Sequence, residues 1–107
     1  MTLDEANQYA RMTLAQHNAK HLRVRFTNTQ RRLGCYSPLK EEIQITKKAL
    51  GSFSLFREIL LHELAHHLDF QERGTFRTNG RNDFHGKNWK KWCLTLGVRA
   101  RRFIPVN

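Results

Sequence analysis

The chain is organised around one stretch, Phe56-Arg57-Glu58-Ile59-Leu60-Leu61-His62-Glu63-Leu64-Ala65-His66. Apolar residues recur in it at helical spacing, and the apolar stripe continues to Leu68. Ser52 or Ser54 can cap the start of this helix, and the pattern predicts an end near Gln71. A helix with such a strong apolar stripe is expected to lie at the core of the fold.

Shorter elements are predicted on both sides of this helix. A capping box at Thr2-Leu3-Asp4-Glu5 predicts a first helix that ends near His17. Alternating apolar and polar residues predict strands over residues 22–27 and 41–46, with a short strand over 32–36. The polar, glycine-punctuated segment 72–84 is expected to be a loop. Trp89, Trp92, Cys93 and Leu96 predict a further helix that Gly97 terminates.

These elements predict an α+β fold with a small, mainly antiparallel three-stranded sheet packed against the central helix, plus two further helices. The length of 107 residues suits a single domain over residues 1–107. We expect a cytoplasmic location, because the N-terminus lacks the features of a signal peptide and no apolar run is long enough for a membrane span. The protein is also expected to be a monomer. Cys35 and Cys93 are expected to be free and buried.

The chain is strongly basic, with 19 Lys and Arg against 9 Asp and Glu and a net charge of +10. Such a balance favours polyanionic partners, above all nucleic acid, through contacts with phosphate groups. A nucleic-acid partner, with single-stranded DNA favoured, would make the protein nucleoid-associated. Trp89 and Trp92 could stack on unpaired bases, but their helical spacing favours a place in the core.

Two histidines of the central helix have the spacing of metal ligands. His62 and His66 are four residues apart, so they lie on one face of the helix and can both reach one zinc ion. Glu63 lies beside the first histidine, where its carboxylate can act as general base toward an activated water. This His-Glu-x-x-His pattern predicts a zinc-dependent hydrolase that cleaves peptide bonds.

A catalytic zinc ion needs a third protein ligand. The spacings of two commoner zinc-peptidase classes fail, because Asp69 and Glu72 stand where Gly and His would be needed and no glutamate follows Glu72. The remaining donors are His67, which is turned away around the helix, Asp69, Asp83 and His85. We predict His85 as the third ligand, because it precedes Gly86 and can swing onto the metal. Asp69 is expected to hold the tautomer of a ligand histidine.

At these positions the chain resembles the SprT-like (Spartan-type) zinc metallopeptidase domain. The resemblance is carried by residues 56–66 and by Asn82-Asp83-Phe84-His85-Gly86-Lys87-Asn88-Trp89, with weaker similarity around Leu33-Gly34-Cys35-Tyr36-Ser37 and Ile43-Gln44-Ile45. It implies a zincin-like fold, one zinc ion held by His62, His66 and His85, and catalysis by Glu63. It also implies cleavage of proteins associated with or crosslinked to DNA.

The chain departs from many relatives because it has no cysteine-rich zinc ribbon after the peptidase core. Contacts with DNA would then come from the basic residues of the domain itself, for which the predicted set is Arg23, Arg25, Arg31, Arg32, Lys87, Lys90, Lys91, Arg99, Arg101 and Arg102. The alternative function is a basic DNA-binding module whose zinc site is structural or inactive. Tyr36 and His67 are the two guesses for a group that stabilises the oxyanion.

Overall fold

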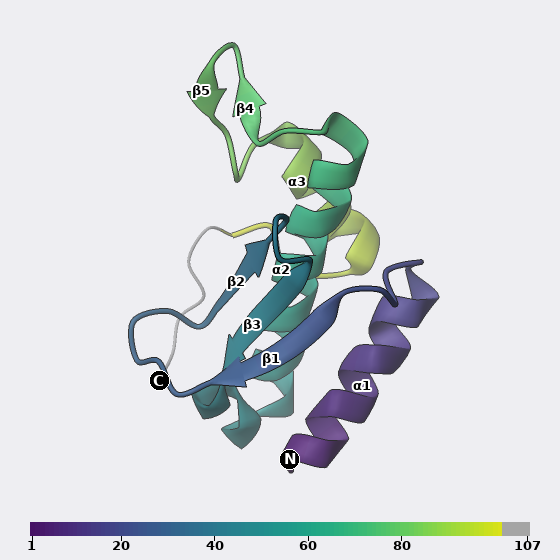
Figure 1. Cartoon of the computed structure of the whole chain (residues 1–107), viewed down its shortest axis with the longest axis vertical. Helices are drawn as coiled ribbons and strands as arrows, with labels where there is room; N and C mark the ends of the chain where they lie inside the picture. The colour runs from purple at the N-terminus through teal and green to yellow at the C-terminus, as the bar shows by residue number, and fades with distance from the viewer. Residues whose placement is uncertain (102–107) are drawn as a thin grey trace.

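The computed structural model of the chain describes residues 1–101, which form three α-helices, a three-stranded sheet and a two-stranded hairpin (Figure 1). The sheet lies across the long helix α2, and α1 lies beside the outer strand β1 (Figure 1). The predicted α+β class is therefore confirmed. No helix within residues 1–101 combines the length and apolarity needed to cross a membrane.

Helix α1 spans Leu3–Gln16 and begins at the predicted capping box. The Thr2 amide donates to Oε1 of Glu5 at 2.8 Å, and the Glu5 amide donates to Oγ1 of Thr2 at 3.1 Å. These two bonds satisfy donors that a helix start would otherwise leave unpaired. The helix ends before His17, as predicted, and buries Ala6, Ala10 and Leu14 on one face.

The sheet contains β1 (Arg23–Thr27), β2 (Gly34–Ser37) and β3 (Glu42–Thr46), in the spatial order β1-β3-β2. Strands β2 and β3 form an antiparallel hairpin, whereas β1 runs parallel to β3 with Val24 opposite Ile43. The sheet is thus mixed rather than mainly antiparallel. The three strands predicted from the sequence are present with boundaries shifted by one or two residues.

The parallel pairing arises because β3 takes the central position. Ile43 and Ile45 are fully buried, and Glu42 and Thr46 are also buried, so β3 is covered more completely than either outer strand. The link over residues 28–33 can reach about 20 Å, which exceeds the roughly 10 Å between two strands that flank a third. The link is therefore long enough to leave a gap of one strand between β1 and β2, and β3 occupies this gap.

Helix α2 spans Phe53–Arg73 and follows a short 3₁₀ segment, η1 (Lys47–Gly51). Of the two predicted caps, Ser52 is the one used, and its Oγ accepts from the Leu55 amide at 3.3 Å. The helix ends at Gly74, whose φ of 73° places it in the left-handed region. The sheet and helix α3 (Lys87–Leu96) pack against different parts of α2, which explains its extensive burial.

The segment predicted as a loop contains a small hairpin between α2 and α3. Strands β4 (Arg77–Thr78) and β5 (Arg81–Asn82) pair across Asn79 and Gly80, which have φ values of 53° and 80°. An Asn-Gly pair with positive φ at both residues is the turn that best fits a two-residue hairpin. This signal was available in the sequence, and the loop prediction overlooked it. Helix α3 ends at Gly97, as predicted.

At Gly34 the sheet approaches α2 closely. A Cβ atom at this position would lie 2.7 Å from Cγ2 of Ile59 and 3.0 Å from the carbonyl oxygen of Gln44. It would also lie 3.4 Å from Cγ of Glu63. The absence of a side chain at Gly34 therefore sets the distance between β2 and the part of α2 that carries Glu63.

We expect Gly34→Ala to lower the free energy of unfolding by about 1–3 kcal/mol, because the added methyl group forces β2 and α2 apart. Gly51→Ala is the matched control, since a Cβ there meets nothing within 4 Å. The control should be neutral or stabilise the protein by up to about 1 kcal/mol through the unfolded state. Urea unfolding of both variants measures the difference, and equal midpoints would contradict the proposed close contact.

Candidate functional site

A cavity of about 340 Å³ lies between α2, β2 and the segment that precedes α3. It contains all the residues that the sequence predicted for metal binding and catalysis. Its lining consists of Arg32, Gly34, Cys35, Tyr36, His62, Glu63, His66, Phe76, Phe84 and His85. The polar hairpin segment contributes two aromatic side chains, Phe76 and Phe84, which pack against each other with ring centroids 5.0 Å apart.

The three predicted ligand histidines gather on one side of this cavity. The ring centroids of His62 and His66 are 6.3 Å apart, and those of His66 and His85 are 4.9 Å apart. His62 and His85 are separated by 6.4 Å. Among residues 1–101, no three His, Cys, Asp or Glu side chains are arranged so that they could hold a metal ion. The fold therefore brings the predicted ligands together without placing them in a ligating arrangement.

A contact with the C-terminal segment holds one of these rings. Nε2 of His62 lies 2.5 Å from the carbonyl oxygen of Arg101. A carbonyl oxygen only accepts hydrogen bonds, so Nε2 carries the proton and Nδ1 keeps its lone pair. The Arg101 guanidinium in turn forms two bonds with the Glu58 carboxylate, at 2.7 and 2.8 Å. The segment after α3 is thereby fastened to α2 one turn before His62.

Trp89 is the common neighbour of the three histidines. It is 1% exposed, and its ring stacks on His66 at a centroid distance of 5.3 Å. It meets both His62 and His85 edge-on at 4.7 Å. The expected place of Trp89 in the core is confirmed, but its contact with all three histidines was not predicted. The spacing of four residues between His85 and Trp89, across the start of α3, was the available signal.

Glu63 is buried on the side of α2 that faces β2. Burial raises the pKa of its carboxyl group to about 8, and the guanidinium charge of Arg32 opposes this shift. A carboxyl group with a pKa near neutrality can both accept and return a proton at physiological pH. Arg32, predicted only as a DNA contact, thus lies at the candidate active site and influences its central carboxyl group.

His66 is held as a neutral imidazole. Burial, followed by the nearby His85 and His62, lowers its pKa to about 3. Its Nδ1 is buried and has no hydrogen-bond partner within residues 1–101. Neutral imidazole with an available lone pair is the form of histidine that binds metal ions.

Asp69 is fully buried one turn beyond His66. Its oxygens accept from Nε and Nη2 of Arg73 at 2.6 and 2.9 Å, and from Nδ2 of Asn88 at 2.8 Å. Arg73 also donates to the carbonyl oxygen of Asp83 at 3.0 Å. These bonds tie the end of α2 to both sides of His85. These hydrogen bonds connect Asp69 to Arg73 and Asn88 rather than to a histidine. The role of Asp69 in holding a histidine tautomer therefore stays a prediction.

The other candidate donors lie outside the histidine group. Asp83 accepts from the Thr78 hydroxyl at 2.8 Å, within the hairpin segment. His67 is turned away from His66, as the helical geometry predicted, and its Nδ1 lies 2.8 Å from the Tyr36 hydroxyl. Burial raises the pKa of that hydroxyl to about 12, so Tyr36 keeps its proton at neutral pH. Tyr36 lines the cavity and His67 does not.

The two cysteines are free, as predicted, but they differ in burial. Cys93 is fully buried on α3. Cys35 is only half-buried and lines the cavity, so the expectation of full burial was wrong for it. The reason is its position on β2, an outer strand of the sheet beside the open side of the cavity.

The basic residues predicted to contact DNA are distributed over several elements of the chain. Arg23 and Arg25 lie on β1, Arg31 and Arg32 lie in the link before β2, and the remaining described residues lie on α3 or after it. Three members of the set form ion pairs with acidic residues: Arg25 with Glu42, Lys91 with Glu72, and Arg101 with Glu58. Arg102 lies outside the described residues. The predicted set therefore comes from several separate parts of the chain, and its contact with DNA stays a prediction.

Comparison with known protein families gives a match. The model of the SprT-like family matches residues 3–106, which cover nearly the whole chain. No curated protein and no solved structure matches the chain. The family match agrees with the α+β fold described above. The chain belongs to the SprT-like family, whose domains are of the metallopeptidase type.

Proposed function

We propose that this protein is a zinc-dependent endopeptidase that acts on proteins associated with or crosslinked to nucleic acid. The observation that carries the proposal is the grouping of His62, His66 and His85 around one cavity that the buried Glu63 also lines. A buried carboxylate is costly to maintain, and a metal site with a purely structural role has no need of one beside its first histidine. This favours the enzyme over a DNA-binding module with a structural zinc ion.

The donor set fits zinc in its chemistry. Three imidazoles can hold a catalytic zinc ion. Two of them come from α2, and His85 comes from the segment just before α3. His66 has a buried nitrogen without a partner within residues 1–101, and His62 keeps the lone pair of Nδ1 while Nε2 bonds a backbone carbonyl. Ligand histidines in metalloproteins usually donate their other ring N–H in this way. His62, His66 and His85 are therefore the residues that would hold the ion.

The chain's own residues supply the proton transfers. The chemistry that zinc supplies when bound is Lewis-acid polarisation of the peptide carbonyl and acidification of a water molecule. Glu63 takes a proton from the attacking water and returns it to the nitrogen of the leaving amine. Tyr36 keeps its proton at neutral pH and lines the same cavity. In the His67 tautomer whose Nδ1 donates to the Tyr36 oxygen, the hydroxyl proton is available for the oxygen of the substrate carbonyl. Of the two guesses for this role, Tyr36 has the better position.

The outer edge of β2 supports a polypeptide substrate. Within residues 1–101, β2 pairs only with β3, so the backbone groups of its other edge are free of strand pairing. Gly34, Cys35 and Tyr36 of this strand line the cavity. An extended peptide can add to such an edge through main-chain hydrogen bonds. This mode would carry a peptide bond past Glu63 without requiring a particular side-chain sequence.

We expect Glu63→Gln to keep its zinc content and to cleave a denatured protein about 10²–10⁴-fold more slowly than the parent. The amide is nearly the same size as the carboxyl group but cannot accept the proton. Glu72→Gln is the matched control, because it makes the same change on the exposed last turn of α2. Zinc analysis and initial cleavage rates are measured on all three proteins. Parental activity in Glu63→Gln would rule out the proposed mechanism.

Arg73 is the residue that positions His85, because it connects Asp69 on α2 with the backbone of Asp83. We expect Arg73→Gln to weaken zinc binding about 10–100-fold, the usual effect of losing a group that orients a ligand. Arg73→Lys should have a smaller effect, since it keeps the charge but not the two-pronged contact with Asp69.

Zinc affinity in the Arg73 series is measured by competition with a chromophoric chelator, and circular dichroism monitors the fold. His85→Ala provides the reference for complete loss of the third ligand. If Arg73→Gln folds normally and binds zinc as tightly as the parent, Arg73 does not position His85. If His85→Ala also binds zinc like the parent, the proposed ligand set itself is wrong.

A further inference from the structure

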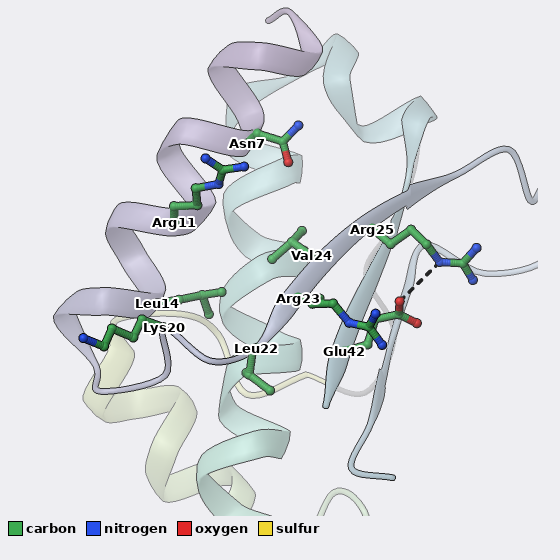
Figure 2. Close-up of a pocket in the computed structure, with 9 residues that line it drawn as sticks. All are labelled: Asn7, Arg11, Leu14, Lys20, Leu22, Arg23, Val24, Arg25 and Glu42. Carbon is green, nitrogen blue, oxygen red and sulfur yellow. Dashed lines mark ion pairs between the residues drawn. The ribbon is translucent and has the colours of Figure 1, made fainter. Parts of the chain in front are cut away.

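A second cavity, of about 540 Å³, lies between α1 and the outer strand β1. It shares no lining residue with the candidate active site. Strands β1 and β2 are the two outer strands of the sheet, so the two cavities lie at opposite edges of it. Figure 2 shows the side chains that line this second cavity, which we call the α1–β1 groove.

Positive charge dominates the α1–β1 groove. Its exposed cations are Arg11 on α1, Lys20 in the turn that follows, and Arg23 and Arg25 on β1. Within residues 1–101, Arg11 and Lys20 form no ion pair, so their charges are available to a ligand. Cations in a concave site lined by low-dielectric walls attract anions more strongly than the same cations on a flat surface.

One carboxylate lies in the α1–β1 groove, and it is already compensated. Glu42 is 5% exposed and accepts from Nε2 of Gln44 at 2.8 Å. It also lies 3.4 Å from Nε of Arg25 (Figure 2). The hydrogen bond from Gln44, with the charges of Arg25 and Arg23, lowers the pKa of Glu42, so it is ionised at neutral pH. Four cations against one carboxylate leave the lining with a formal excess of three positive charges.

The groove also has apolar walls, formed by Leu14, Leu22 and Val24. Leu14 and Leu22 are buried, and Val24 is half-buried. The combination of aliphatic walls and a cationic rim suits a ligand that carries anionic groups on an uncharged frame. A nucleic-acid strand has this character, with phosphates along a sugar backbone, and the chain's net charge of +10 adds a long-range attraction to such a polyanion.

We propose that the α1–β1 groove binds the phosphate groups of a nucleic-acid strand. This inference rests on the nucleic-acid association proposed above and assigns it to a specific site. Arg11 and Lys20, which sequence analysis did not select, join Arg23 and Arg25 as phosphate contacts. Because the groove and the active-site cavity occupy opposite edges of the sheet, the protein can hold a strand while the β2 edge stays open to a polypeptide.

The test measures binding of a fluorescent single-stranded oligonucleotide by anisotropy over a series of salt concentrations. The groove variant Arg11→Gln with Lys20→Gln removes two phosphate contacts and leaves the Arg25–Glu42 pair intact. The matched control Lys47→Gln with Lys48→Gln removes the same charge from exposed positions on η1, outside the groove. We expect the groove variant to bind about tenfold more weakly, with a salt slope smaller by about 1.4, since each contact with a single strand contributes about 0.7.

We expect the control variant to stay close to the parent in both affinity and salt slope. Equal losses in the two variants would overturn the groove proposal, because binding would then follow overall charge. No binding by the parent would overturn the nucleic-acid association as well. Peptide cleavage without nucleic acid should be the same in parent and groove variant, which separates this inference from the peptidase mechanism and confirms folding.

Two competitors identify the source of the anionic group. Pyrophosphate that displaces the oligonucleotide at concentrations too low to change the ionic strength would assign the groove to small phosphate compounds. An acidic peptide that competes as well as an unlabelled oligonucleotide of equal charge would assign it to carboxylates. Either result overturns the assignment to nucleic acid. Displacement by the unlabelled oligonucleotide alone supports it.

Discussion

The packing of the structure depends on hydrogen bonds to the polar side chains that α2 buries in the core. Burying a polar group costs free energy unless it finds a partner, and α2 buries His62, His66, His67, Glu63 and Asp69. Three of these side chains find partners outside α2, whereas Nδ1 of His66 has none within residues 1–101. Asp69 binds Asn88 at the start of α3, His67 contacts Tyr36 on β2, and His62 contacts the segment after α3. These contacts with α2 hold α3, β2 and the segment after α3 around the candidate active site.

The two outer strands of the sheet provide two different surfaces. Strand β2 borders a cavity with neutral imidazoles, a buried carboxyl group and aromatic side chains, a setting suited to proton transfer near a metal ion. Strand β1 borders a groove with aliphatic walls and a cationic rim, a setting suited to an extended polyanion. The insertion of β3 between them keeps these surfaces apart. A protein attached to nucleic acid presents a polypeptide and a polyanion together. The fold has a separate sheet edge for each of them: β2 for the polypeptide and β1 for the polyanion.

Local rules accounted for the helices and for part of the site. The ends of α1, α2 and α3 follow from a capping box, a serine cap and two glycines in the left-handed region. The hairpin at Asn79 and Gly80 could have been predicted by the same kind of rule. Sequence spacing could not reveal the arrangement of the strands, because pairing between β1 and β3 depends on which strand is buried most completely rather than on the order along the chain.

The sequence by itself determined that His62 and His66 share one face of a helix with Glu63 beside them, because the helical repeat fixes those positions within a few residues. It also determined the basic character of the chain. Only the tertiary structure decided that Arg32 and Tyr36 join this site, that Asp69 pairs with Arg73 and Asn88, and that Arg11 and Lys20 lie near β1. These contacts join segments that are distant in sequence or separated by turns, and packing of the whole core selects them.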